Sequence, residues 1–228
     1  MLINEKNILF WEEIMRRKRL LFVLSLSLIC MILIVLSDFT KQESKSIELV
    51  IIDSGISKEK EILLPDNWSI KYHSSKENKN NHADLVLQQI LNNVVYEEDV
   101  NIIIHDIVVS NSNSISTEDL YNALSIAKEL DSDIINLSLG VSIDDDSIKE
   151  IIEHINKNNT VVVAAAGNKF GMSAQYPARY KDVISVGSLN QKGDVSNFSA
   201  MKYVDEYRLG EYETYSGTSF SAPIVTAE

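Results

Sequence analysis

The feature that most constrains the fold is a regular alternation of short apolar runs with segments of helical periodicity after residue 45. Five runs rich in Ile and Val are typical of buried parallel strands: residues 47–52, 101–109, 133–139, 160–165 and 183–186. Helices are expected between them, at residues 83–94, 116–130 and around 148–155. This repetition predicts an α/β fold with a doubly wound, mainly parallel sheet and functional sites at the carboxyl ends of the strands.

The amino-terminal part of the chain has a different character. Residues 20–36 form a seventeen-residue apolar run that directly follows four basic residues, 16–19. The pattern predicts a single transmembrane helix at residues 20–37. It is preceded by a cytoplasmic segment at 1–19 and followed by a linker at 38–45 and a domain at 46–228 outside the cytoplasm. A cleaved signal peptide is the alternative, but no small-x-small site lies near residues 35–40, which favours an uncleaved anchor in the cell membrane.

The charge of the chain excludes some partners. The formal net charge is −12, and the residues after position 37 alone carry −14. A surface of this sign disfavours nucleic acid, whose phosphates need Lys and Arg for neutralisation. The single cysteine, Cys30, lies in the apolar run, so the chain forms no internal disulfide.

Asp53 is the first candidate for a functional side chain. It ends the first apolar run and precedes Ser54 and Gly55, so its carboxylate is expected at the carboxyl end of a buried strand. Asp-Ser-Gly is also an ordinary turn sequence, and the motif alone does not distinguish the two interpretations.

His82 is placed at the start of a predicted helix by the apolar residues that follow it at helical spacing. A neutral imidazole there can accept a proton from a hydroxyl while its other nitrogen donates to a carboxylate such as Asp53. The alternative is a surface residue at a helix start. The other histidines lack this context and are interpreted as structural: His73, His105 and His154.

Asn168 follows the run at residues 160–165 through two small residues, Ala166 and Gly167. An amide at the mouth of a strand is suited to stabilise an oxyanion, and the loss of one such donor costs about 10² to 10³ in turnover in an enzyme that uses one. As a bare turn, Gly-Asn would be unremarkable.

Ser219 lies in the most specific motif of the chain, Ser-Gly-Thr-Ser-Phe-Ser-Ala-Pro at residues 216–223. Small residues before Ser219 allow a close approach of the backbone, and Pro223 is tolerated in the first turn of a helix. A serine at a helix amino terminus lies beside free N–H groups that can receive an oxyanion. The nucleophile and part of its stabiliser would then come from one place.

These motifs resemble the four blocks of the subtilisin family of serine peptidases and stand in its order, with spacings of 29, 86 and 51 residues. The resemblance runs from about residue 47 to the end and implies a subtilisin-like fold. It implies acyl transfer in which Ser219 is the nucleophile and His82 the base. Asp53 would orient the imidazole, and Asn168 would bind the oxyanion.

The same resemblance implies a peptide substrate. The run at residues 135–140 is similar to the strand on which the family binds an extended peptide, and residues 164–167 would wall the pocket for the residue before the cut. The substrate-binding residues implied are Ser138, Leu139, Gly140, Ala165 and Gly167.

Three departures bear on this expectation. Ala83-Asp84-Leu85 replaces the Gly-Thr-His that usually follows the histidine of the family. The carboxylate of Asp84 would either raise the pKa of the His82 imidazole or face solvent, and the second alternative is favoured. Fourteen residues separate Asp38 from Asp53, which leaves no room for the prodomain of secreted relatives. The chain stops nine residues after Ser219, and the short helix that results supplies little dipole and little packing to hold the nucleophile.

The function expected is that of a membrane-anchored serine endopeptidase that cleaves peptides or proteins outside the cytoplasm. The alternative is a truncated or inactive homologue that binds peptides or regulates a partner, and a more remote one is an esterase. No cofactor is expected. Calcium is often bound by relatives, but the run Asp144, Asp145 and Asp146 is explained more simply as the acidic start of a helix, so no metal site is predicted.

Overall fold

The computed structural model describes residues 5–40, 46–74, 80–95, 100–109 and 115–228, without the side chains of residues 5–12 and 33–40. The chain divides into two units, Met1–Ser44 and Lys45–Glu228. The described part of the first unit is one helix, and the second unit is an α/β domain.

The amino-terminal helix is α1 (Glu5–Thr40). The predicted transmembrane segment, residues 20–37, lies within it, but the side chains of residues 33–37 lie outside the described part. Over the residues that the structure describes, no helix is long and apolar enough to cross a membrane, so the predicted transmembrane helix is not supported. The predicted linker, residues 38–45, lies largely outside the described residues.

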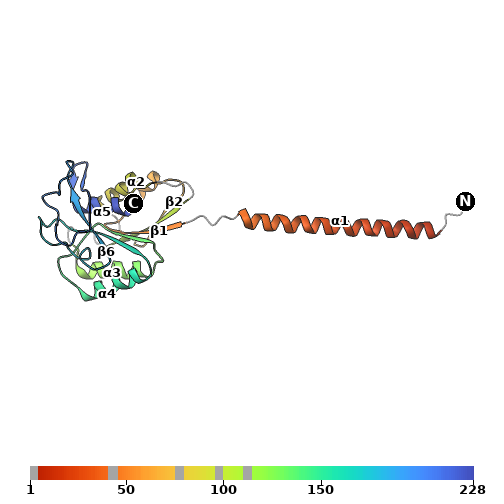
Figure 1. Cartoon of the computed structure of the whole chain (residues 1–228), viewed down its shortest axis with the longest axis horizontal. Coiled ribbons are helices and arrows are strands. Elements are labelled where there is room, and N and C mark those ends of the chain that lie inside the picture. The colour runs from red at the N-terminus through yellow and green to blue at the C-terminus, as the bar shows by residue number, and fades with distance from the viewer. Residues whose placement is uncertain (1–4, 41–45, 75–79, 96–99, 110–114) are drawn as a thin grey trace. The chain divides into compact units, whose positions relative to one another are not determined.

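The domain is built on a seven-stranded sheet in the order β2-β3-β1-β4-β5-β6-β7, and all neighbouring strands are parallel (Figure 1). Its strands are β1 (Ser46–Asp53), β2 (Trp68–Tyr72), β3 (Asn101–Val108), β4 (Ile134–Leu137), β5 (Val161–Ala165), β6 (Val183–Leu189) and β7 (Glu206–Leu209). A short antiparallel pair, β8 (Glu211–Tyr212) and β9 (Tyr215–Ser216), completes the strands described. The sheet grows on both sides of β1, which confirms the doubly wound, parallel prediction.

Helices cover both faces of this sheet (Figure 1). One face packs against α3 (Thr117–Lys128) and α4 (Asp146–Lys157), and the other against α2 (His82–Asn93) and α5 (Thr218–Ala227). A 3₁₀ segment, η1 (Lys58–Leu63), follows β1. Successive side chains of β1, such as Val50 and Ile51, point to opposite faces and are both fully buried, as a strand covered on both sides requires.

The helix starts follow from local chemistry. Ser116 caps α3, because its side chain accepts a hydrogen bond from the backbone N–H of Asp119, whose carboxylate accepts from Ser116 in return. Asp145 caps α4 by accepting hydrogen bonds from the N–H groups of Ser147 and Ile148. The helix predicted to begin at residue 116 is thereby confirmed, and the acidic run at residues 144–146 does open a helix.

Candidate active site

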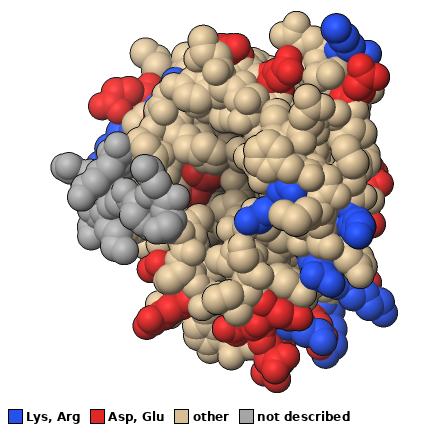
Figure 2. Space-filling view, turned by 90° about the vertical axis from the view of Figure 1, so that its left-hand side faces the viewer, with Lys and Arg blue, Asp and Glu red and all other residues tan. Residues whose placement is uncertain are grey.

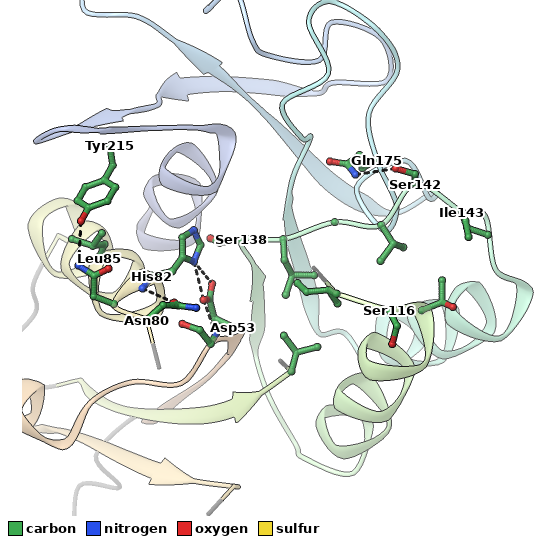
Figure 3. A pocket seen from close by; sticks show the side chains of 18 residues that line it. Asp53, Asn80, His82, Leu85, Ser116, Ser138, Ser142, Ile143, Gln175 and Tyr215 are labelled. Atoms are coloured by element: carbon green, nitrogen blue, oxygen red, sulfur yellow. Dashed lines mark hydrogen bonds and ion pairs between the residues drawn. The ribbon is translucent and has the colours of Figure 1, made fainter. Parts of the chain in front are cut away.

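Asp53 and His82 are brought together by the ends of two elements. Asp53 is the last residue of β1 and His82 the first residue of α2. Nδ1 of His82 lies 2.8 Å from Oδ1 and 3.0 Å from Oδ2 of Asp53 (Figure 3). The Asp53 side chain is 3% exposed and that of His82 33%, so a buried carboxylate holds an imidazole that still reaches solvent.

The protonation of His82 depends on this contact. Burial lowers the pKa of the His82 imidazole, but the hydrogen bond and the negative charge of Asp53 outweigh burial, and the net pKa is raised above its ordinary value. The backbone N–H of Ser54 donates a hydrogen bond of 2.7 Å to Oδ1 of Asp53, which fixes the carboxylate. Nδ1 of His82 therefore donates to Asp53, and Nε2 is left to act as a base.

Asp84 is buried, which corrects the prediction that it faces solvent. It is 7% exposed, and its carboxylate accepts hydrogen bonds from the N–H of Ser57 at 2.8 Å and the hydroxyl of Ser57 at 2.7 Å. The N–H of Ala83 donates to the hydroxyl of Ser54 at 3.1 Å. A polar side chain at a helix start usually reaches water, but here the loop that follows β1 lies over it and supplies donors.

Ser219 and Asn168 both lie close to Gly217. A Cβ atom built on Gly217 would lie 3.2 Å from Nδ2 of Asn168 and 3.3 Å from Oγ of Ser219. Oδ1 of Asn168 accepts a hydrogen bond of 3.0 Å from the backbone N–H of Thr218 and one of 3.3 Å from its hydroxyl. These contacts fix Oδ1 of the amide against Thr218, so that the NH₂ group is the part of Asn168 that lies closer to Gly217.

Ser219 lies in α5, which covers the same face of the sheet as α2, the helix of His82. It is half-buried in the first turn of α5, and the ring of its neighbour Phe220 lies 5.6 Å from the His82 ring between centroids. Among the hydrogen bonds of the described residues, none joins Ser219 to His82. The two side chains share one end of the sheet without the contact that proton transfer needs.

A cleft of about 740 Å³ opens beside the Asp53–His82 pair (Figure 3). Its lining includes Ser138, Leu139 and Gly140, which follow β4 and were predicted to bind substrate. In the described part of the chain the lining does not include Ala165, Gly167, Asn168 or Ser219. Ala165 is 3% exposed and packs in the apolar core, so the prediction that it contacts substrate receives no support from its position.

Comparison with known proteins agrees with this geometry. The profile of the subtilase family, peptidase family S8, matches residues 44–227. The chain belongs to the subtilase family.

Its relatives among characterised proteins are serine proteases. The chain is 36% identical over 123 residues to the major intracellular serine protease of Bacillus subtilis (strain 168), covering 47% of this chain and 39% of that protein. It is 30% identical over 129 residues to thermitase of Thermoactinomyces vulgaris, covering 52% of this chain and 46% of that protein. The chain thus spans less than half the length of these two relatives.

Solved structures confirm the subtilisin-like fold. A cold-adapted subtilisin-like serine proteinase superposes with a TM-score of 0.64 and 20% sequence identity, covering 82% of this chain and 75% of the other. A lanthipeptide protease superposes with a TM-score of 0.65 and 19% identity, covering 79% of this chain and 71% of the other.

Gln175 occupies the space between two predicted substrate-binding glycines of this subtilase. A Cβ on Gly140 would lie 3.0 Å from Cβ of Gln175, and one on Gly167 would lie 2.8 Å from its Cγ. Gly167 also has a φ of +94°, which side-chain-bearing residues rarely adopt. Nε2 of Gln175 donates to Oγ of Ser142 at 3.4 Å (Figure 3). Sequence reasoning missed Gln175, because nothing local predicts that its side chain reaches across the end of the sheet.

Asp106 is a third buried carboxyl group near the pair. It lies in β3, level with Ile51 of β1, and is 2% exposed. Its carboxylate accepts a hydrogen bond from the backbone of Ile56, while Oδ1 has no partner in the described part of the chain. Burial raises the pKa of Asp106 to about 7, with the charges of Asp53 and Asp84 acting in the same direction and the Ile56 hydrogen bond opposing them.

Two carboxylates of the acidic run at residues 144–146 already accept hydrogen bonds. Asp145 already accepts two backbone hydrogen bonds, and Oδ2 of Asp144 accepts one of 2.9 Å from the hydroxyl of Tyr176. Over the residues described, no group of three or more metal-ligating side chains comes together. Oδ1 of Asp145 caps α4, and Oδ2 of Asp144 accepts from Tyr176.

Proposed function

We propose that this subtilase is a serine endopeptidase that uses Asp53, His82 and Ser219. The observation that carries the proposal is the pair of hydrogen bonds between Asp53 and His82 at the edge of a cleft, with Asn168 and Ser219 both close to Gly217. A buried carboxylate, a partly exposed imidazole and a hydroxyl at a helix start are the groups that acyl transfer requires.

In the first step, Oγ of Ser219 attacks the carbonyl carbon of the scissile peptide bond and gives its proton to Nε2 of His82. Asp53 stabilises the imidazolium that forms, in keeping with the raised pKa of His82. The carbonyl oxygen becomes an oxyanion and receives hydrogen bonds from Nδ2 of Asn168 and the backbone N–H of Ser219.

In the second step, His82 returns the proton to the leaving amine as the carbon–nitrogen bond breaks, and an acyl ester remains on Ser219. A water molecule then gives a proton to His82 and attacks the ester, and the carboxylic acid leaves as Ser219 regains its proton. Each proton moves through Nε2 of His82, so the reaction needs no cofactor.

The substrate proposed is an extended polypeptide. Ser138, Leu139 and Gly140 follow a short strand and line the cleft, so their backbone groups are available to pair with a peptide as an added strand. Gly167 and Gln175 bound the space for the side chain before the cut.

The test is Ser219-dependent labelling by a fluorophosphonate probe, together with cleavage of a mixed peptide library. We expect the full chain to be labelled and active, and Ser219→Ala to be neither. Labelling that persists in Ser219→Ala, or the absence of both labelling and cleavage in the wild type, contradicts the proposal.

A second candidate is a catalytically inactive subtilase that binds peptides in the same cleft. It is favoured by one observation, the missing hydrogen bond between Ser219 and His82 among the described residues. An inactive homologue would bind the library peptides in Ser219→Ala and in the wild type equally, and would release no products from either.

We propose the cell membrane as the location, with residues 20–36 as an anchor and the domain outside the cytoplasm. The support is the apolar run and the four basic residues before it. Large apolar side chains of α1 such as Leu21 and Phe22 are 65% and 67% exposed, and a lipid bilayer would remove them from water. Extraction of membranes at alkaline pH tests this: an anchored chain stays with the lipid, and a chain that is released was not anchored.

A further inference from the structure

Near the cleft, large apolar side chains face solvent on one continuous surface. Their exposed fractions lie between 50% and 75%, although side chains of this size usually gain stability by burial. The residues are Phe170, Met172, Met201 and Tyr203, together with the basic residues Lys169, Arg179 and Lys202. We call these seven residues the Phe170 surface. Exposed apolar patches bounded by charge are typical of binding sites.

The backbone makes this surface continuous. The N–H of Phe170 donates to the carbonyl of Phe198 at 2.8 Å, and the N–H of Met201 donates to the carbonyl of Met172 at 3.0 Å. Two segments about thirty residues apart in sequence therefore run side by side. The guanidinium of Arg179 lies 4.5 Å from the centroid of the Tyr203 ring, which fixes that ring as well.

The Phe170 surface continues from the wall of the cleft. Nζ of Lys169 donates to Oγ of Ser142 at 3.3 Å, and Ser142 lines the cleft beside Gln175. Lys169 itself directly follows Asn168, the proposed oxyanion donor. A polypeptide held in the cleft and extending past this wall would meet the Phe170 surface.

The charge of this surface is opposite to that of the chain. Lys169, Arg179 and Lys202 take part in none of the ion pairs between described residues, whereas the whole chain carries −12. Asp144 accepts a hydrogen bond from the hydroxyl of Tyr176, and the guanidinium of Arg179 lies 5.5 Å from the centroid of the Tyr176 ring. Figure 2 shows Lys and Arg side chains gathered to the right of a hollow in the face that it displays. Cations that form no ion pair with the described residues are available to an acidic ligand.

We propose that the Phe170 surface binds an acidic segment with interspersed aromatic or aliphatic residues, and that this segment belongs to the polypeptide substrate, outside the residues that flank the cut. The apolar side chains would bury those of the segment, and the three cations would attract its carboxylates. That the occupant is substrate rests on the proposed peptidase function. The binding itself does not require catalysis.

The test measures binding directly, with the full-length Ser219→Ala protein and fluorescent ten-residue peptides. One peptide alternates acidic with aromatic residues, a second keeps the aromatics but replaces the acids by Ser and Gln, and a third reverses the charge with Lys. We expect the acidic peptide to bind at least about tenfold more tightly than either of the others, and the difference to shrink at about 0.5 M salt. Equal binding of all three peptides overturns the proposal.

Two variants locate the binding. Lys202→Glu reverses one charge of the Phe170 surface, and Phe170→Asn removes its most exposed ring; asparagine tolerates the positive φ of 50° at this position. We expect each to weaken binding of the acidic peptide about fivefold or more. The matched control is Lys157→Glu, the same charge reversal at an exposed residue at the end of α4. Equal losses in Lys202→Glu and Lys157→Glu contradict the proposed location.

Cleavage separates this proposal from the proposed function. The acidic segment is attached to either end of a short cleavable peptide, and we expect it to lower KM in at least one arrangement while kcat stays within about twofold. Lys202→Glu should cancel the gain, yet leave fluorophosphonate labelling unchanged. If the chain is labelled but the acidic segment does not lower KM, the peptidase function stands and the proposal for the Phe170 surface is wrong. If the chain binds the acidic peptide but is not labelled, the Phe170 surface stands and the peptidase function is wrong.

Discussion

The carboxylate of Asp84 accepts two hydrogen bonds from Ser57, one from its N–H at 2.8 Å and one from its hydroxyl at 2.7 Å. Asp84 stands two residues after His82, and Ser57 four residues after Asp53. The contact therefore ties the helix that carries the imidazole to the loop that follows the carboxylate. The Asp84–Ser57 contact stabilises the position of the Asp53–His82 pair without a hydrogen bond to either side chain.

Removal of this tie should slow the reaction without weakening substrate binding. We expect Asp84→Ala to lower kcat about 10- to 100-fold, because a small displacement of a catalytic group is costly, and to leave KM within about twofold. Asp84→Asn can still accept from the Ser57 N–H and should restore most of the activity. If Asp84→Asn is as slow as Asp84→Ala while both melt like the wild type, the hydrogen bonds to Ser57 do not position the pair.

The charge of Asp53 should set the pH at which His82 becomes a base. Asp53 raises the pKa of His82 by stabilising the imidazolium, so its removal must lower that pKa. In Asp53→Asn we expect the acid limb of the kcat/KM profile to move to lower pH, while kcat falls by about 10⁴. A profile measured from pH 5 to 9 checks both. An unchanged acid limb would mean that another group controls the proton on His82.

Asp106 should make stability depend on pH. Its pKa is about 7 in the fold and 3.8 as the reference value, so the folded state holds a proton that the unfolded chain has already released. The free energy of unfolding therefore falls as pH rises from about 4 to about 7. Above about pH 7 the destabilisation caused by the buried charge of Asp106 is constant. Asp106→Asn carries no charge to bury, so its advantage over the wild type should appear above pH 7 and vanish near pH 4.

Thermal melts at pH 4, 6 and 8 check the Asp106 prediction. Each 1 kcal/mol corresponds to a shift of about 2–4 °C for a domain of this size, and we expect Asp106→Asn to melt at least about 4 °C above the wild type at pH 8. A difference in Tm that is the same at all three pH values would assign the effect to packing. A matched change at an exposed carboxylate, Asp146→Asn, should show no such trend.

Gln175 should limit the side chain that fits before the cut. Its side chain fills the space between Gly140 and Gly167, so Gln175→Gly opens that space. We expect kcat/KM for substrates with Phe or Leu before the cut to rise about tenfold or more relative to Ala, the effect of a few added methylenes in a pocket. Gln175→Leu keeps the space filled and should retain the wild-type preference. A profile of cleavage sites that does not change in Gln175→Gly excludes Gln175 from this pocket.

The central part of the fold was predictable because its pattern is local. The apolar run of β1 and the isoleucines of α4, all buried, identify a buried strand and a one-sided helix from periodicity alone. The edge strands β2 and β7 were missed, since their sequences Trp-Ser-Ile-Lys-Tyr and Glu-Tyr-Arg-Leu mix polar and apolar residues as strands with fewer buried neighbours do. Edge pairing is decided by the neighbouring strand.

The site divides in the same way. Asp53 and His82 could be predicted to meet, because one ends a strand and the other starts a helix in a family order. The burial of Asp84 could not, since Ser57 lies 27 residues away and either residue alone suits solvent. The position of Gln175 likewise depends on Gly140 and Gly167, because these two glycines on other segments have no side chains and leave the space that Gln175 fills. Contacts made across the end of the sheet leave no periodic trace in the sequence.

The hydrogen bond from the N–H of Thr218 to Oδ1 of Asn168 joins the oxyanion donor to the helix that carries the nucleophile. Ser219 and Asn168 are therefore held together as one unit, and His82 and Asp53 are held together as another. The helices that carry these two units pack against each other, with Nε2 of Gln89 in α2 donating to the carbonyl of Phe220 in α5 at 3.3 Å. The relative position of these two helices therefore decides whether Ser219 and His82 can exchange a proton.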